Sequence, residues 1–339
     1  MSNQNSQIVQ LTQEVNRIAQ GKVAAINEIN REATFLAINA SIEAAHAGQV
    51  GRGFSVVASH LKEVSQKIGA LTTELSTELT ALAERMVSQL QEQDAQRMVD
   101  LAANMIEIID RNLYERSCDV RWWATDAAVT DCAARQDAQA LAHASSRLGI
   151  ILDNYTVYLD IWIIGLDGRV IANGRSGRYG VAGNHSVARA EWFTKALGTQ
   201  SGADYAVTDI EISEALGKAQ VATYATAIRE GGQERGAPTG VLAVFFDWEP
   251  QARAVLDSVR MSEEDKASVR CMLIDANYRV LASSDGRGVL TERYPLRREE
   301  GQKTGHYDVD QGRVAFAETP GYETYKGLGW LGVIARVKD

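Results

Sequence analysis

The residue types that most often carry out chemistry are sparse in this 339-residue sequence and follow no catalytic spacing. The sequence contains no P-loop, no glycine-rich dinucleotide motif, no HExxH and no nucleophile elbow. Its histidines lack the spacing of metal ligands, and its three cysteines form no CxxC pair. We therefore predict a protein that is not an enzyme, needs no cofactor, binds no metal and keeps reduced thiols in the cytoplasm. The residues concerned are His46, His60, His143, His185, His306, Cys118, Cys132 and Cys271.

The residues that could bind a partner form an apolar stripe near the N-terminus. Phe35, Ile38 and Ile42 recur at helical spacing on one face, beside Glu43. An apolar stripe with a flanking charge suits a helix that docks into the groove of another protein. The alternative is that the stripe packs inside a helical bundle, which is the commoner use of such a pattern. Both interpretations require a helix here.

The N-terminal third is predicted to be helical, because no proline lies between Ile8 and Ile150 and all four lie at or after Pro238. Apolar residues then recur at alternating steps of three and four, which is a coiled-coil heptad. These residues are Phe54, Val57, Leu61, Val64, Ile68, Leu71 and Leu75.

A glycine-rich interruption separates two helical segments at residues 47–53. Gly48, Gly51 and Gly53 permit a tight reversal there, since glycine is costly inside a helix. Residues 1–47 are therefore expected to fold back on residues 51–97 as an antiparallel hairpin with arms of ~70 Å. One hairpin buries little apolar surface, so we expect a homodimer in which two copies form a four-helix bundle.

The C-terminal part is predicted to hold two antiparallel sheets on one long helix, which gives an α+β fold overall. A β-hairpin with an Asp167-Gly168 turn follows the strand-like run at Tyr158–Leu166. A similar segment recurs 110 residues later at Met272–Ala282, which indicates an internal repeat. The predicted domains are a hairpin at 1–97, a helical stalk at 98–156, a first module at 157–260 and a second module at 261–339.

The segment INREATFLAINASIEAAHAGQVGRGFSVVASHLKEVSQK (29–67) closely resembles the signalling tip of methyl-accepting chemotaxis proteins. In that family the tip is a helical hairpin that binds the histidine kinase CheA and the adaptor CheW. The resemblance implies the same partners here, and it implies a binding role for Phe35, Ile38, Asn39, Ile42, Glu43 and Val56. The matching positions are Asn39, Glu43, Ala44, Ala45, Ala47, Gly48, Gly51, Arg52, Gly53, Phe54, Val56, Val57 and Ala58.

Three departures from the family pattern concern contacts between receptor dimers. Arg31 replaces an aromatic residue, His46 replaces the arginine of EAAR, and His60 replaces a glutamate. These changes disfavour a trimer of dimers. The short arms and the C-terminal residues ARVKD also disfavour adaptation by methylation.

Residues 98–339 resemble a double Cache sensor, in which a long helix carries two PAS-like modules. The resemblance rests on the internal repeat, on Arg189–Phe193, on Gly240–Asp247 and on GYETYKGLGWLGVI at 321–334. It implies that the first module holds a small ligand between its sheet, a capping helix and loops.

The predicted pocket lacks the residues with which Cache sensors hold amino acids. Ala190 stands in place of the carboxylate-binding arginine, and Phe245 stands in place of the ammonium-binding aspartate. The remaining aromatic, amide and charged groups suit a purine-like heterocycle or a small organic acid. The predicted ligand contacts are Asn173, Arg175, Trp192, Phe193, Tyr205, Asp209 and Asp247.

Composition argues against nucleic-acid binding and against a membrane-spanning helix. A net charge of −9 disfavours nucleic acid as a partner, and no apolar run reaches the ~20 residues that a membrane helix needs. We therefore expect a cytoplasmic chemoreceptor that binds a small molecule and regulates CheA with CheW. The alternative is a cytosolic sensor or scaffold that dimerises through its hairpin without controlling a kinase.

Overall fold

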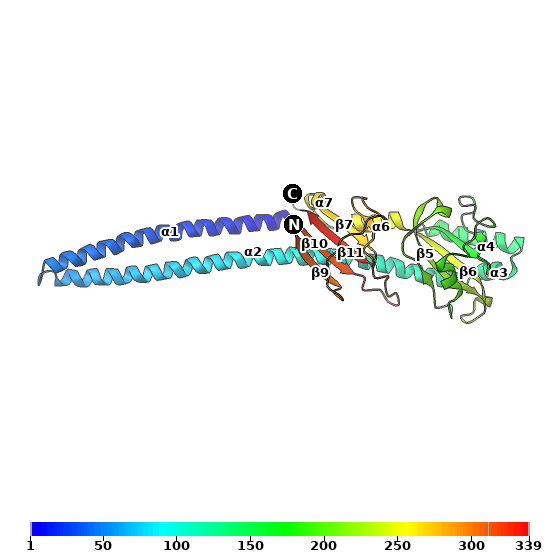
Figure 1. Cartoon of the computed structure of the whole chain (residues 1–339), viewed down its shortest axis with the longest axis horizontal. Helices are drawn as coiled ribbons and strands as arrows, with labels where there is room; N and C mark the ends of the chain where they lie inside the picture. The colour runs from blue at the N-terminus through cyan, green and yellow to red at the C-terminus, as the bar shows by residue number, and fades with distance from the viewer. Residues whose placement is uncertain (1, 311, 338–339) are drawn as a thin grey trace. The chain divides into compact units, whose positions relative to one another are not determined.

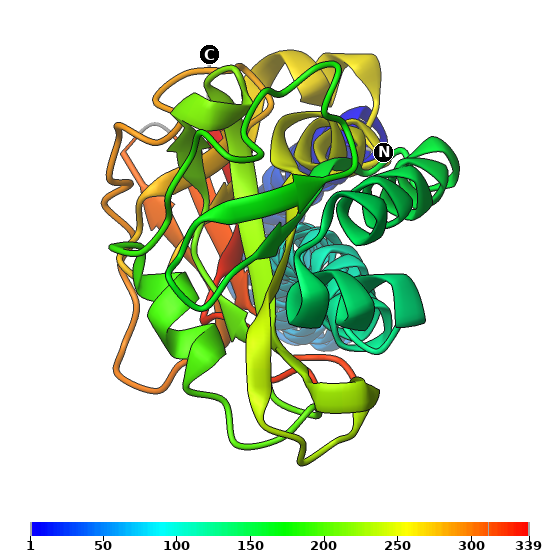
Figure 2. The same ribbon diagram turned by 90° about the vertical axis from the view of Figure 1, so that its right-hand side faces the viewer.

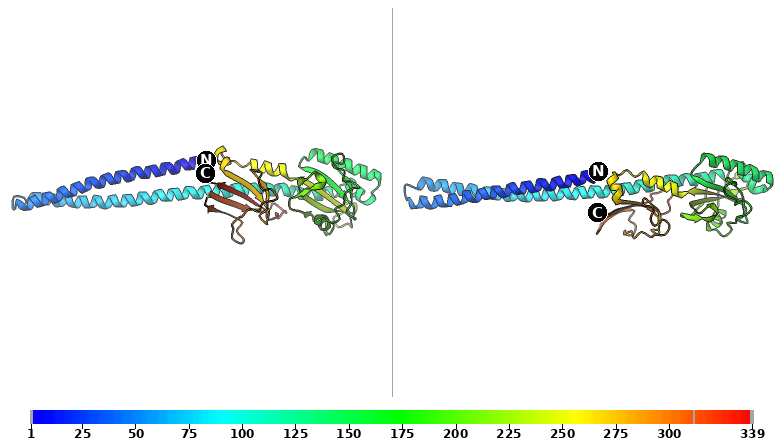
Figure 3. Two further views of the ribbon diagram at one scale, coloured as in Figure 1. Left: turned by 45° about the horizontal axis from the view of Figure 1, so that its top comes forward. Right: turned by 90° about the horizontal axis from the view of Figure 1, so that it is seen from above.

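The computed structural model describes residues 2–310 and 312–337, and it divides the chain into two compact units, Met1–Ala95 and Gln96–Asp339. The first unit is an antiparallel pair made by helix α1 (Ser2–His46) and the first part of helix α2 (Arg52–Trp123). The two helices lie side by side in Figure 1 and in both views of Figure 3. The predicted hairpin and its turn are therefore confirmed.

The seam between the two arms of the hairpin consists of small and polar residues. The Nδ2 of Asn30 donates to the Ser65 carbonyl oxygen over 2.8 Å, and the Nε2 of Gln20 donates to the Thr80 hydroxyl over 2.9 Å. Buried positions recur every seven residues from Ala37 onward, the period that keeps one helix face turned inward, and Val23 lies two such periods before Ala37. They are Val23, Ala37 and Ala44 on α1, Gly51 in the turn, and Ala58, Ser65 and Thr72 on α2.

The large apolar residues of the heptad lie outside this seam. All seven, from Phe54 to Leu75, keep between 38% and 75% of their surface exposed in a single chain. The sequence pattern thus marks a face that the hairpin itself does not cover.

The second unit begins with the remainder of α2, followed by helices α3 (Ala127–Arg135) and α4 (Ala138–Asn154). Asp126 and Asp137 cap these two helices by accepting hydrogen bonds from backbone N–H groups of the first turn. Both helices pack on one face of the first sheet, as Figure 2 shows, and helix α5 (Glu191–Leu197) packs against strands of the same sheet.

The first sheet is antiparallel, with the strand order β2-β1-β6-β5-β3, and β4 also pairs with β5. The β1–β2 pair is the predicted hairpin with the Asp167-Gly168 turn. The strands are β1 (Tyr158–Ile164), β2 (Val170–Asn173), β3 (Ala206–Val207), β4 (Glu211–Ser213), β5 (Ala219–Arg229) and β6 (Pro238–Asp247).

The second sheet repeats this plan with the strand order β8-β7-β11-β10-β9, again antiparallel. Helices α6 (Trp248–Asp257) and α7 (Glu263–Ser268) precede it. The shared order confirms the internal repeat and the predicted fold class. The strands are β7 (Val269–Ile274), β8 (Val280–Ser283), β9 (Thr304–Val309), β10 (Gly312–Glu318) and β11 (Leu331–Val337).

Buried polar contacts fasten α2 to both modules of the second unit. The hydroxyl of Tyr158, on β1, donates to the Asp119 carboxylate over 2.6 Å. The hydroxyl of Thr319 and the backbone N–H of Gly321 both donate to the Asp110 carboxylate.

Within residues 2–310 and 312–337, no helix has both the length and the apolarity needed to cross a membrane.

Candidate functional site

The turn at the end of the hairpin depends on two of its three glycines. Gly48 has a φ of +63°, a conformation that favours glycine, and its carbonyl oxygen accepts a hydrogen bond from the Gly51 N–H over 3.2 Å. A Cβ atom on Gly51 would overlap the carbonyl oxygen of Ala44, so a side chain there would force the arms apart. Gly53, already inside α2, has open space around it.

The predicted docking residues beside this turn are all exposed. Phe35 is 65% exposed and Ile42 is 51% exposed, whereas Ala37 and Ala44 on the same helix face inward. The acidic side chain of Glu43 lies 3.9 Å from the imidazole of His46, and both are open to solvent. In one chain the stripe is therefore outside the seam of the hairpin. Asn39, Ile38 and Val56 complete the exposed set.

In the first module of the second unit, polar groups converge on the buried carboxylate of Asp160. It accepts hydrogen bonds from Asn173 Nδ2 at 2.8 Å, from Trp162 Nε1 at 2.9 Å and from the Arg175 backbone N–H at 2.9 Å. Burial raises the pKa of Asp160, and these donors oppose that effect by stabilising the charged form. The network fixes the side chains of Asn173 and Trp162 on the sheet.

Aromatic rings cover the same face of the sheet. Phe245 lies between Trp162 and Trp192, with ring centroids 4.2 Å and 6.1 Å away. Trp192 and Phe193 come from helix α5 and are both buried. Together with Tyr179 they form an apolar cluster, which we call the aromatic core.

Three buried polar atoms around the aromatic core have no hydrogen-bond partner in the described part of the chain. They are Asn173 Oδ1, the Tyr179 hydroxyl and the Thr223 hydroxyl. Thr223 lies directly across from Phe245 in the pairing of β5 with β6, and Asn173 lies across from Trp162. Buried polar atoms normally find partners, so these three stand out among the side chains around the aromatic core.

The seven predicted ligand contacts do not all lie together. Asn173, Trp192 and Phe193 lie at the aromatic core, and Asp247 ends strand β6 next to it. Burial raises the pKa of Asp247, Glu249 raises it further, and Arg178 opposes the increase.

The other three predicted contacts have partners elsewhere. The Arg175 side chain donates to Asp153 at 2.8 Å and to the Leu152 carbonyl oxygen at 2.9 Å, at the end of α4. Tyr205 stacks on Tyr224 with centroids 6.0 Å apart. The remaining side chain, that of Asp209, accepts a hydrogen bond from Trp330 Nε1 of the second module over 2.6 Å.

A cavity of about 480 Å³ adjoins the aromatic core through Trp192. Thr208, Asp209 and Glu211 line it from the first module, and Arg279 lines it from the second. Burial raises the pKa of Glu211, while the nearby Arg279 lowers it. Arg279 also donates to the Ile210 carbonyl oxygen over 3.0 Å, so this cavity lies where the two modules meet.

Sequence reasoning did not select Asp160, Trp162, Tyr179 or Thr223 as site residues. Asp160 did carry a signal, because an acid inside an apolar strand must be paired or functional. The described residues contain no group of three or more His, Cys, Asp or Glu side chains that could hold a metal ion.

Comparison with known proteins connects both regions to chemoreceptors. Residues 1–147 match the signalling domain of methyl-accepting chemotaxis proteins. The chain is 36% identical over 97 residues to the methyl-accepting chemotaxis protein NahY of Pseudomonas putida, covering 28% of this chain and 17% of that protein. It is 33% identical over 87 residues to methyl-accepting chemotaxis protein IV of Escherichia coli, covering 26% and 15%. The matches thus span less than a fifth of the length of these two curated relatives.

Solved structures with a similar fold are sensor domains. The ligand-binding domain of the Pseudomonas fluorescens chemoreceptor CtaA, solved with L-isoleucine, has a TM-score of 0.52 at 15% identity, covering 74% of this chain and 95% of that one. That of the Pseudomonas aeruginosa amino-acid chemoreceptor PctB, solved with L-Arg, has a TM-score of 0.51 at 16% identity, covering 73% and 97%. At this identity the likeness concerns the fold alone. Residues 1–147 of the chain thus match the signalling domain of methyl-accepting chemotaxis proteins, and the second unit shares its fold with the ligand-binding domains of chemoreceptors.

Proposed function

We propose that this protein is a chemoreceptor that binds a small molecule in its first Cache module and regulates CheA, together with CheW, through the hairpin tip. The observation that carries the proposal is the tip surface itself. Phe35, Ile38 and Ile42 are exposed beside a turn that matches the chemotaxis signalling domain, and they are not needed to hold the hairpin together. An exposed apolar stripe of this kind suits docking into a groove of a partner.

The tip can be tested by binding. Immobilised full-length protein should retain purified CheA and CheW, and the substitution Ile38→Asp should reduce the amount retained at least tenfold, because it places a charge in the apolar contact. Leu11→Asp is the matched control, because Leu11 is also exposed on α1 but lies far along the helix from the turn. Equal loss with both substitutions would contradict docking at the tip.

In the sensor unit, we place the ligand at the aromatic core, where Asn173 Oδ1 and the Tyr179 and Thr223 hydroxyls lack partners. Ala190 is the residue before α5, and the Phe245 ring packs on Trp162, so neither position offers a charge to an amino acid. This supports a purine-like heterocycle or a small organic acid rather than an α-amino acid.

A thermal-shift panel of purines, organic acids, amines and amino acids tests the choice of ligand. A compound present at 100 times its dissociation constant should stabilise the sensor by about 2.7 kcal/mol. The substitution Thr223→Val should abolish the shift while leaving the fold intact. A response to amino acids alone would contradict the proposed ligand class.

The signal is proposed to reach the hairpin through α2, which both sensor modules hold by buried hydrogen bonds at Asp119 and Asp110. Packed helices have discrete arrangements, so a shift of β1 against Asp119 would move α2 as a unit. The substitution Met86→Pro should break the helix between sensor and tip. It should uncouple ligand from kinase without changing ligand affinity; retained coupling would contradict this route.

We place the protein in the cytoplasm, as a homodimer without enzymatic activity of its own. The location is supported by three free cysteines, of which Cys132 and Cys271 are buried. Burial raises their pKa values to about 12 and about 11, which keeps both thiols protonated and unreactive. Fractionation of cells should recover the protein with cytoplasmic markers, and recovery with periplasmic markers would contradict this location.

A further inference from the structure

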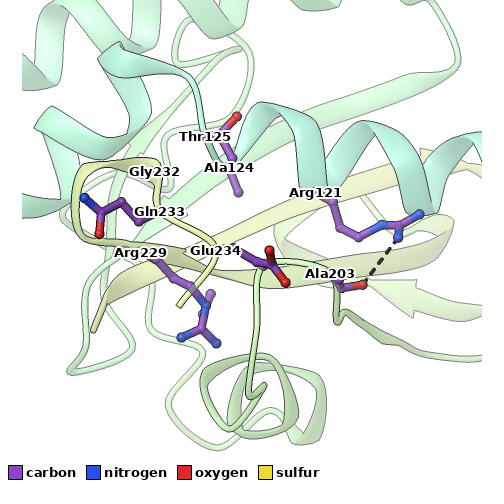
Figure 4. Close-up of a pocket in the computed structure, with 10 residues that line it drawn as sticks. Arg121, Ala124, Thr125, Ala203, Arg229, Gly232, Gln233 and Glu234 are labelled. Carbon is purple, nitrogen blue, oxygen red and sulfur yellow. Dashed lines mark hydrogen bonds between the residues drawn. The ribbon is translucent and has the colours of Figure 1, made fainter. Parts of the chain in front are cut away.

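A second cavity lies at the end of strand β5, and it shares no lining residue with the aromatic core. It has a volume of about 280 Å³. Three segments surround it, as Figure 4 shows: the end of α2, the loop before β3 and the turn between β5 and β6. The lining residues that matter below are Arg121, Ala124, Ala203, Ala227, Arg229 and Glu234.

Arg229 brings a buried positive charge to this cavity. Only 6% of the residue is exposed, and its Nε is buried without a hydrogen-bond partner. Its terminal nitrogens donate to the Gly236 carbonyl oxygen at 2.9 Å and to the Thr199 carbonyl oxygen. No carboxylate in the described part of the chain forms an ion pair with it. A buried charge without a counter-ion is costly, so an anion would complete its surroundings.

Arg121 supplies a second cation to the same cavity. It donates to the Ala203 carbonyl oxygen at 3.3 Å, the contact drawn in Figure 4, and to the Ser117 carbonyl oxygen at 2.7 Å. Its guanidinium lies 5.4 Å from the centre of the Tyr205 ring. Among the described residues Arg121 also has no carboxylate within ion-pair distance. The rest of the lining includes Ala124, Ala203 and Ala227.

We propose that this cavity binds a small organic anion, with its carboxylate held by Arg229, its charge favoured by Arg121 in the same lining, and a compact apolar body against the three alanines. Charge-assisted hydrogen bonds from arginine would provide most of the selectivity, because a neutral amide of the same shape would leave the Arg229 charge uncompensated. Glu234 also lines the cavity, and its side chain lies between the two arginines in Figure 4, so it opposes the anion and tunes its affinity. The inference does not depend on the proposed control of a kinase.

Calorimetric titration of the full-length protein tests the proposal, with benzoate as the probe, benzamide as its neutral counterpart and inorganic phosphate as an anion without an apolar body. Benzoate should bind saturably, and benzamide and phosphate should each bind at least tenfold more weakly. Arg229→Met should weaken benzoate binding at least tenfold, with circular dichroism confirming that the variant is folded.

A second variant tests anion binding without removing the hydrogen bonds by which Arg229 holds the Gly236 and Thr199 carbonyl oxygens. Glu234→Gln leaves every hydrogen bond of Arg229 in place and should strengthen benzoate binding up to about fivefold by removing a nearby negative charge. Glu214→Gln, exposed in the same module but outside the cavity, should change nothing. The proposal is overturned if benzamide binds as tightly as benzoate, if no anion binds, or if Thr223→Val removes benzoate binding while Glu234→Gln has no effect.

Discussion

The hairpin and the sensor unit treat their apolar residues in opposite ways. In the second unit Trp162, Phe246 and Phe316 are at most 1% exposed, and strands and helices of the same chain cover them. In the first unit Leu71 is 64% exposed and Phe54 is 75% exposed. The second unit thus completes its own cores, whereas the hairpin uses small residues for its internal seam and leaves the large ones exposed in a single chain.

This difference predicts that the stability of the two units depends on protein concentration in different ways. A core closed within one chain unfolds independently of protein concentration, whereas a face that needs a second copy is stabilised by mass action. Four predictions, ordered by the size of their expected effects, can sharpen or break this comparison.

The largest effect is expected in the sensor core. Leu242→Ala removes a fully buried side chain on β6 and should lower the free energy of unfolding by about 3 kcal/mol, through lost burial and the cavity left behind. Urea unfolding of the full chain measures it, and the loss should be the same at low and high protein concentration. Ile212→Ala, at a residue 55% exposed, should change stability by less than about 0.5 kcal/mol.

The next effect concerns the open face of the hairpin. The pair of substitutions Leu61→Ser and Ile68→Ser should weaken dimerisation by about 2 kcal/mol, a factor of about 30 in the dissociation constant, because apolar area is lost from the contact. Sedimentation equilibrium measures the dimer, and sensor unfolding should be unchanged. Unaltered dimerisation would mean that this face has another use.

The turn gives a smaller effect with a closely matched control. Gly51→Ala should destabilise the hairpin by about 1–2 kcal/mol, because its Cβ would overlap the Ala44 carbonyl oxygen. Gly53→Ala, two residues further and with open space, should stabilise the helix by about 0.5–1 kcal/mol. Thermal melting followed at 222 nm compares them, and a shift in the same direction for both would contradict the geometry of the turn.

The smallest effect is a pH dependence at the contact between Asp110 and the second module. Burial raises the pKa of Asp110 in the folded state, despite its hydrogen bonds from Thr319 and Gly321. The protonated Asp110 side chain therefore stabilises the folded state. This stabilisation is fully present at pH values below the unfolded-state pKa near 3.8, and it is lost as the pH rises through the folded-state pKa. Asp110→Asn should remove this dependence, so that the stability of the variant relative to wild type rises between pH 4 and pH 7. A relative stability that falls over this range would contradict the sign.

Local patterns in the sequence predicted most of the fold. The helical hairpin, its glycine turn and the repeated strand pairs depend on neighbouring residues, and each is confirmed; the pairing of the heptad face with a second copy stays a prediction. The short strands β3 and β4 were missed, because two or three residues carry no detectable alternation.

The candidate site was harder to predict, because its contacts join residues far apart in the chain. Asp209 has the residue type of a ligand contact, yet its carboxylate binds Trp330, 121 residues away. The side chain of Arg175 likewise binds the end of α4, 22 residues before it. The spacing of residues in the sequence does not reveal such distant partners. The unpaired hydroxyl of Thr223 is equally hidden in the sequence, because it becomes apparent only when β5 is paired with β6.

The central claim is that the tip controls a kinase rather than only assembling with it. The most direct measurement is the rate of CheA autophosphorylation with CheW, with and without the full-length protein, and with the Ile38→Asp variant as control. We predict a severalfold change in rate with the wild-type chain and no change with the variant. Wild-type protein that binds CheA and CheW and leaves the rate unaltered would contradict the claim and support a scaffold that dimerises without kinase control.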